Sequence, residues 1–425
     1  MQHRIIVLGA GYTGASAAGR LARRLRREDV AITLVNAEPD FVERVRLHQL
    51  ASGQDLAPRP LRKMFEGTGV TLRIARVTGL DADRRTVTVR DPDGTGEAEE
   101  LTYDTLVHAL GSAWDGRGVP GAAEHAHEVA SRAGALRLRE RLAGLAAGAP
   151  VVVVGGGLTG LEAATEIAEA RPDLDVALAA RGGLGEPLSP KARRHLRKVF
   201  DGLGITVHEH TAVTAVEAAR VRTGDGTPIP AEVTVWTAGF AVHPLTGDTT
   251  LEVSGTGQIV VDATMRSLSH PQVYAIGDAA LAAGPGGKPL RMSCATGIPS
   301  AWQAADAIAA RLTGTKLPNV PLRYFNQCVS LGRRQGLIQY VTADDRAVRA
   351  ALTGRTAALY KEIVCKGAAW GVAHPTFGLP VRRRPVLPAP AGTDPAAGAE
   401  AAAGAEAAVR TDPAVEAGAA AESPA

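Results

Sequence analysis

Two copies of a glycine-rich fingerprint constrain this chain most, because each copy stands where an apolar strand should turn into a helix. The copies are IIVLGAGYTGASAAGRLA, with Gly9, Gly11 and Gly14, and VVVVGGGLTGLEAATEIAE, with Gly155, Gly157 and Gly160. Such glycines allow a tight turn, close approach of the backbone to a pyrophosphate, and close packing of helix on strand. The free N–H groups at the start of the helix then favour the diphosphate. We therefore expect two bound dinucleotides, with electrons passing from one to the other.

Composition limits the number of domains, the kinds of site and the cellular location that we expect. The 425 residues suit two or three domains, and a net charge of +3 gives no reason to invoke nucleic acid. The three cysteines are scattered, without CxxC spacing, so neither a dithiol centre nor a metal site is expected. The first strand begins by Ile5, which leaves no room for a signal peptide, and no apolar run is long enough to span a membrane. We expect a cytoplasmic protein whose membrane contact is at most peripheral, at the inner face of the membrane.

The two fingerprints begin parallel halves of an internal repeat, 146 residues apart. Each half continues with a second strand, a hairpin, and an apolar strand that ends in glycine, at Gly111 and Gly239. This pattern predicts an α/β fold with two Rossmann-like domains. From about residue 318 a smaller segment follows, with two strands and a helix that we expect to pack on the core. The Ala/Pro/Gly-rich stretch 385–425 is predicted to be disordered.

The residue at the tip of the second strand of each half bears on the nucleotide. In this fold that position usually holds a carboxylate for the adenosine ribose. The first half has Asn36 there, which fits either a ribose contact or a simple turn. The second half has Arg181 and no carboxylate, which would suit a 2′-phosphate, whereas Gly160 as third glycine favours NADH. The choice between NADH and NADPH stays open.

Taken with the VYAIGDAA stretch near residue 278, these motifs resemble the two-dinucleotide-binding flavoproteins. The closest resemblance is to type II NADH dehydrogenases and apoptosis-inducing-factor-like oxidoreductases, over residues 1 to about 312. The resemblance implies a glutathione-reductase-like fold in which the NAD(P) domain is inserted in the FAD domain. FAD would occupy the first fingerprint, with Gly277 and Asp278 at its ribitol, and NAD(P)H the second. The implied divisions are 1–113 and 240–317 for FAD, 114–239 for NAD(P)H, a C-terminal segment 318–384, and the tail 385–425.

Glu162 is the residue we expect nearest the chemistry. It follows Gly160 by two positions, and the matching glutamate of the family lies near nicotinamide and flavin. A carboxylate in the first turn of a helix is also favoured by the helix dipole alone. Glu166, one turn on, is the weaker candidate. His48, His108 and His127 are expected to be structural or surface residues, since no acid partner is evident.

The acceptor side departs from the family pattern. The first helix has no cysteine pair, which excludes disulfide reduction, and the loop 41–53 carries Glu43, Arg44 and Arg46 near the expected flavin. Ile298 and Pro299 replace the Ala-Gln pair of the family's quinone helix. We expect a polar small-molecule or quinone acceptor. The alternatives are a protein electron carrier such as ferredoxin, docked by residues 43–46 and the LGRRQG turn, and a redox-sensing flavoprotein. A homodimer is compatible with any of these.

Overall fold

The computed structural model describes residues 1–318, 320–378 and 381–388, of which Met1–Pro385 forms one compact unit. From residue 389 onward the predicted disordered tail lies outside the described residues. The fold class predicted from the sequence is confirmed, because two separate parallel sheets each carry one fingerprint.

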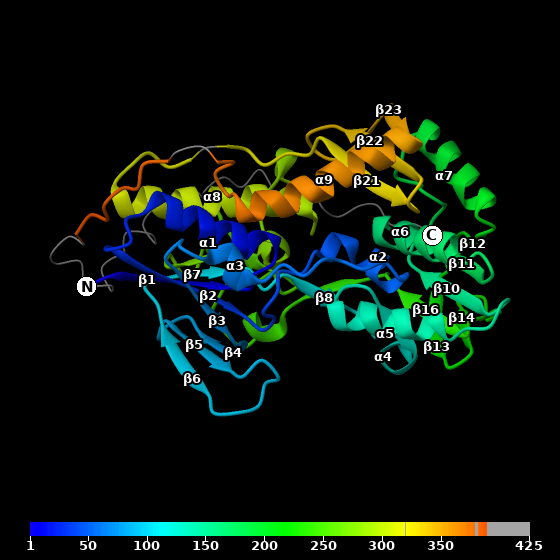
Figure 1. Ribbon diagram of the computed structural model, residues 1–425, viewed down its shortest axis with the longest axis horizontal. Helices are drawn as coiled ribbons and strands as arrows, with labels where there is room; N and C mark the ends of the chain where they lie inside the picture. Colours follow the sequence, from blue (N-terminus) through cyan, green and yellow to red (C-terminus); the bar gives the residue numbers. More distant parts are fainter. Residues whose placement is uncertain (319, 379–380, 389–425) are drawn as a thin grey trace, which may run out of the picture. The chain divides into compact units, whose positions relative to one another are not determined.

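The first sheet has five parallel strands in the order β19–β7–β1–β2–β3. Their bounds are Val273–Ala275, Thr105–His108, His3–Leu8, Val30–Asn36 and Val70–Ile74. The end of β1 is buried on both faces, which explains its continuous apolar run. Helix α1 (Tyr12–Arg24) follows β1 and packs against α8 (Cys294–Thr313), as Figure 1 shows. A small antiparallel sheet extends this half through β4 (Arg76–Asp81), β5 (Thr86–Arg90) and β6 (Glu99–Thr102).

The second sheet repeats this plan in the order β12–β11–β10–β16–β9. Its strands span Thr206–His208, Asp175–Ala179, Pro150–Val154, Val233–Trp236 and Ala126–Glu128. Its helices are α5 (Arg132–Ala143), α6 (Leu158–Ala170) and α7 (Pro190–Gly202), with the short α4 (Ala122–His125). An antiparallel sheet of β13 (Val213–Glu217), β14 (Arg220–Thr223) and β15 (Pro228–Pro230) completes this half.

The chain enters and leaves the second half side by side. Strand β8 (Ser112–Trp114) leads in and β17 (Phe240–Val242) leads out, and the two pair in antiparallel fashion. After β18 (Ile259–Val260) the chain returns to the first sheet as β19, and β20 (Ala280–Leu281) follows. The second nucleotide-binding half is therefore inserted in the first, as the resemblance implied.

The C-terminal segment forms its own antiparallel sheet, β21–β22–β23, beside helix α9 (Arg355–Ala373). The strands span Asn326–Leu331, Gln335–Val341 and Ala347–Thr353. The sequence predicted only the first two, because the alanines and arginines of β23 have little strand preference. The short helices α2 (Leu47–Ala51) and α3 (Leu61–Phe65) were also missed, within or near the expected loop 41–53.

Helix α9 packs on the core against α1 and β22, as expected, but most of its large apolar side chains stay exposed. Leu359 and Ile363 are 63% and 60% exposed, and Trp370 is also exposed. The inward face instead carries Ala357, Lys361, Cys365 and Ala369, which follow one another at intervals of four. No helix among the described residues is both long enough and apolar enough to cross a membrane.

Candidate active site

The first glycine loop has the geometry that its sequence predicts. Gly9 has a φ of +92°, and a Cβ there would lie 2.5 Å from the carbonyl oxygen of Ala109. A Cβ on Gly14 would overlap the carbonyl oxygen of Gly9. A Cβ on Gly11 would meet nothing within 4 Å, so the second glycine borders open space in front of α1. That space fits a diphosphate held by the helix N-terminus.

The second loop repeats this geometry at the start of α6. Gly155 has a φ of +124°, and a Cβ on Gly160 would overlap the carbonyl oxygen of Gly155. Gly157 again borders open space. Both loops therefore fit the diphosphate of a dinucleotide, by the same division of roles among three glycines.

The first loop opens into a cavity of about 390 Å³, here called the flavin cradle. Predicted site residues line it: Gly9, Gly11, Asn36, Arg44, Gly111 and Asp278. Tyr12 also lines it, and its buried hydroxyl has no hydrogen-bond partner among the described residues. An unpartnered buried hydroxyl fits a cavity whose polar contacts come partly from a bound molecule.

Asn36 has an internal role at the edge of this cradle. Its Oδ1 accepts a hydrogen bond from the N–H of Ala10 at 2.8 Å, and its Nδ2 donates to the carbonyl of Glu38 at 2.7 Å. The sequence left open whether Asn36 contacts the ribose or is a turn residue. These two hydrogen bonds favour a turn residue that holds the loop in shape.

Asp278 and Arg44 meet through a residue that sequence reasoning missed. The hydroxyl of Ser112 donates to Asp278 Oδ2 at 2.7 Å, and Arg44 Nη1 donates to the Ser112 carbonyl at 2.6 Å. Arg44 also lies over the ring of Phe240, 5.4 Å from its centroid. Gly277, with a φ of +65°, turns the chain so that Asp278 lines the flavin cradle. These contacts position the carboxylate that the resemblance assigns to the flavin's ribitol.

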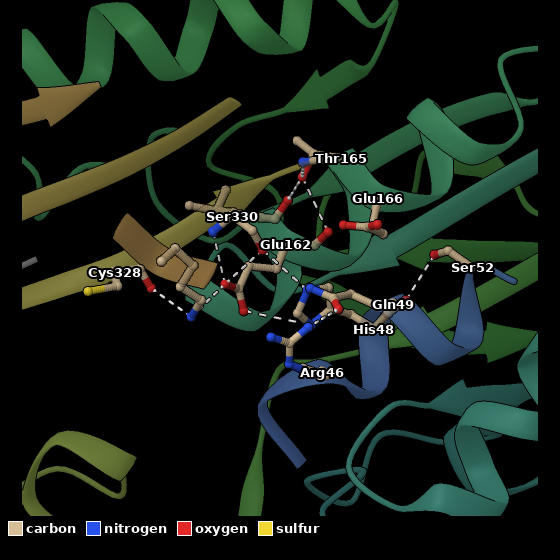
Figure 2. A network of polar contacts seen from close by, with 12 residues as sticks. Arg46, His48, Gln49, Ser52, Glu162, Thr165, Glu166, Cys328 and Ser330 are labelled. Atoms are coloured by element: carbon tan, nitrogen blue, oxygen red, sulfur yellow. Dashed lines mark hydrogen bonds and ion pairs between the residues drawn. The ribbon is translucent and has the colours of Figure 1, made fainter. Parts of the chain in front are cut away.

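Glu162 lies at a junction of three segments, which Figure 2 shows from close by. Its Oε1 accepts from the N–H of Ser330 at 3.0 Å and from the Ser330 hydroxyl at 3.1 Å. Lys361 Nζ, from α9, lies 3.1 Å from the same oxygen. His48 Nδ1, from α2, lies 3.9 Å from Oε2. We call Glu162, Lys361, His48 and Ser330 the Glu162 cluster.

The expectation that Glu162 sits in the first turn of its helix is wrong. Helix α6 begins at Leu158, so Glu162 lies in the second turn, where the dipole helps little. Burial opposes ionisation of Glu162, but the charge of Lys361 and the Ser330 hydrogen bond outweigh burial and lower its pKa. Burial likewise opposes the charge on Lys361, but Glu162 outweighs it and raises the lysine pKa. The two therefore form a buried ion pair.

The three histidines discussed above differ in their burial and in their neighbours. His48 has the carboxylate neighbour that the sequence did not reveal, yet burial lowers its pKa to about 4, so it is neutral near pH 7. Its Nε2 lies 3.2 Å from the Ser330 hydroxyl. His108 is buried in β7, where burial also lowers its pKa to about 4. His127 is half-buried in β9. His108 and His127 are not part of the cluster.

The proposed docking role of residues 43–46 is contradicted. Glu43 and Arg46 are buried and 3.2 Å apart, and Arg46 also lies 2.9 Å from Glu362 of α9. Side chains paired in this way cannot present a charged surface to a partner. Arg333 and Arg334, in the LGRRQG turn, are exposed.

Two other predicted residues lie at the edges of the second half. Arg181 is exposed just beyond β11, and the loop after it brings Glu186 back, whose Oε2 accepts from the N–H of Gly183 at 3.1 Å. Gly239 packs against the segment that follows β8, where a Cβ would lie 2.5 Å from Arg117 Nε. The Glu186 carboxylate thus lies beside the backbone of Gly182 and Gly183, close to the strand tip, which the strand pattern could not reveal.

Comparison with known proteins agrees with this geometry. The pyridine nucleotide-disulphide oxidoreductase family model matches residues 3–309. The chain is 32% identical to the NADH dehydrogenase-like protein Rv1812c of Mycobacterium tuberculosis, covering 77% of this chain and 86% of that protein. It is 28% identical to the type II NADH:quinone oxidoreductase NdhA of the same organism, covering 77% and 76%. The NDH2 structure from Plasmodium falciparum shares the fold, with a TM-score of 0.73 at 14% identity over 90% of this chain and 99% of that one.

These similarities settle the class of the protein. It is an FAD-dependent oxidoreductase that uses NAD(P)H, although α1 carries none of the cysteines that disulfide reduction would need. The chain belongs to the pyridine nucleotide-disulphide oxidoreductase family.

Proposed function

We propose that this protein oxidises NAD(P)H and passes the electrons to a quinone or a quinone-like acceptor. One observation carries the proposal: two glycine loops in one chain each leave open space at the middle glycine, Gly11 and Gly157, in front of a helix N-terminus. The similarity to a protein named as an NADH:quinone oxidoreductase supports the choice of acceptor.

Bound FAD would supply the redox chemistry, taking hydride from NAD(P)H and giving electrons to the acceptor. The chain's own residues bind and orient. Asp278, held by Ser112, offers a carboxylate to the ribitol, and Arg44 closes the same side of the cradle. The first loop holds the diphosphate of FAD and the second that of NAD(P)H.

We propose that the Glu162 cluster holds its side chains in fixed positions near the nicotinamide and flavin rings. Lys361 and Ser330 fix Glu162 in its ionised form. Neutral His48 carries its proton on Nε2 when it donates to the Ser330 hydroxyl, which in turn donates to Glu162. This chain of donors holds a proton at a defined atom, and the Glu162 carboxylate keeps Lys361 protonated.

Stopped-flow absorbance tests the proposal. Anaerobic addition of NADH or NADPH to the yellow holoprotein should bleach the flavin band, and a soluble naphthoquinone should restore it. Holoprotein that neither nucleotide bleaches would reject the donor half. Bleached protein that no quinone reoxidises would reject the acceptor half.

A protein electron carrier is the second candidate, favoured by the exposed arginines of the β21–β22 turn, of which the Arg334 side chain is 82% exposed. Reduction of a cytochrome that depends on added ferredoxin would support it. Any membrane contact would be peripheral and would involve the exposed apolar side chains of α9, such as Leu359 and Ile363.

A further inference from the structure

A second cavity of about 390 Å³ lies between the β21–β22 turn and α9, here called the arginine cavity. Its lining includes Ser330 and Lys361 of the Glu162 cluster, so the cluster forms part of its wall. Gln49 and the small side chain of Ala358 also line it. Four of its lining residues are cations, Arg333, Arg334, Arg355 and Lys361, and only Glu362 is an acid.

The single carboxylate of this cavity does not balance its cations. Glu362 is already shared among Arg46 at 2.9 Å, Lys366 at 3.3 Å and Arg333 at 3.4 Å. These neighbours outweigh the burial of Glu362 and lower its pKa to about 2, so it is ionised but neutralised.

Two arginines are left with weak pairing or none. Arg334 Nε lies 3.6 Å from Glu169 on a largely exposed side chain. Arg355, at the start of α9, has no carboxylate partner within the part of the chain that the structure describes. Burial raises the pKa of the nearby Cys365 thiol, so this residue adds no negative charge. The arginine cavity is therefore a cationic site.

The arginine cavity and the flavin cradle are neighbours. Arg44 lines the cradle, and Arg46, two residues further along the same segment, lies 2.9 Å from Glu362 of the arginine cavity. Helix α9, which carries Glu362 and Lys361, also packs against α1, the helix that follows the first glycine loop. A molecule in the arginine cavity would therefore lie close to the flavin cradle, on the side of the Glu162 cluster.

We propose that the arginine cavity binds the electron acceptor, and that this acceptor is a quinone carrying an anionic group such as a carboxylate or sulfonate. The inference rests on the proposed function and narrows its substrate class. The planar guanidinium forks of Arg355 and Arg334 suit such an anion, and Lys361 would face the ring end. The overall change is balanced: NAD(P)H, one proton and the quinone give NAD(P)⁺ and the quinol.

Steady-state kinetics on the holoprotein test this with a matched pair of acceptors, 1,4-naphthoquinone and 1,4-naphthoquinone-2-sulfonate. We expect Arg355→Gln to raise KM for the sulfonate at least tenfold, and at least fivefold more than it raises KM for the parent quinone. The KM of the variant is compared with that of the wild type for the same acceptor, so the difference in reduction potential between the two quinones cancels. Arg84→Gln, at the exposed turn after β4, is the control and should change neither KM. Added salt should raise KM for the sulfonate alone.

The outcomes distinguish failure of the anionic-quinone inference from failure of the proposed quinone reduction. Equal effects of Arg355→Gln on both acceptors, or no effect on either, would overturn the inference and leave quinone reduction standing. Failure of both quinones to reoxidise NADH-bleached protein would reject the acceptor half of the proposed function instead. Loss of binding to phosphatidylglycerol vesicles in Arg355→Gln, with an unchanged KM ratio, would assign the arginines to a lipid surface and also overturn the inference. Flavin content and the rate of bleaching by NADH verify that the variant is folded.

Discussion

Lys361 Nζ lies 3.1 Å from Glu162 Oε1, and this ion pair joins α9 to the helix that follows the second glycine loop. Both side chains are largely buried. A buried pair of this kind stabilises a fold little more than apolar residues of the same volume would, but removing one partner leaves an uncompensated charge. The pair therefore predicts a marked asymmetry between single and double substitutions.

Lys361→Met should destabilise the protein by about 3–5 kcal/mol, because Glu162 would remain buried without its cation. The lowered pKa of Glu162 stabilises the fold above the ordinary carboxyl pKa and ceases to do so as the pH falls. In Lys361→Met, burial without the cation should instead raise the Glu162 pKa, so that this carboxyl can take up a proton at pH 5 but stays charged at pH 8, and the loss should be larger at pH 8 in urea unfolding. Adding Glu162→Gln should restore most of the stability. A double variant as unstable as Lys361→Met would show that the pair is not coupled.

Glu166→Gln should stabilise the protein at alkaline pH. Burial raises the pKa of Glu166 from 4.5 to about 7, helped by Glu169 and Glu162 and opposed by Arg333 and by Gln54. The folded carboxyl thus binds its proton more tightly than the unfolded one, so stability is lost as the pH rises from about 4.5 to 7. We expect a gain of about 1–3 kcal/mol at pH 8 and little gain at pH 5. Thermal unfolding at the two pH values measures it, with the exposed Glu97→Gln as control.

The glycines of the second loop should separate binding from folding. Gly157→Ala places its methyl group in open space, so stability should change by less than about 1 kcal/mol while KM for NAD(P)H rises at least tenfold. Flavin content should stay at one FAD per chain, because the first loop is untouched. Gly160→Ala, whose methyl would overlap the Gly155 carbonyl, should instead lower Tm. Equal loss of stability in both variants would contradict these roles.

The two glycine loops were predictable because each is local: strand, turn and helix lie within about twenty residues. Each glycine there allows a tight turn, close packing of helix on strand, or close approach of a diphosphate. Asp278 could be found only through a family motif, since nothing near it in sequence indicates a ligand. The Glu162 cluster could not be found, because His48, Ser330 and Lys361 reach Glu162 from three separate segments. One signal was present: Lys361 shares the inward, small-residue face of α9 at intervals of four. Glu43 and Arg46 lie three residues apart, but the sequence did not reveal that they are buried, because Glu362 of α9 reaches Arg46 only in the folded chain.

The loop beyond β11 predicts a preference for NADH over NADPH. The strand tip itself lacks a carboxylate, but Glu186 returns to the N–H of Gly183, next to exposed Arg181. A carboxylate there favours ribose hydroxyls and repels a 2′-phosphate. Glu186→Gln should raise kcat/KM for NADPH relative to NADH about five- to tenfold, which corresponds to about 1 kcal/mol. Arg181→Gln should lower the same ratio, and Glu97→Gln should leave it unchanged. Wild-type protein that uses both nucleotides equally well, with a ratio that Glu186→Gln does not alter, would show that Glu186 lies too far from the ribose to select.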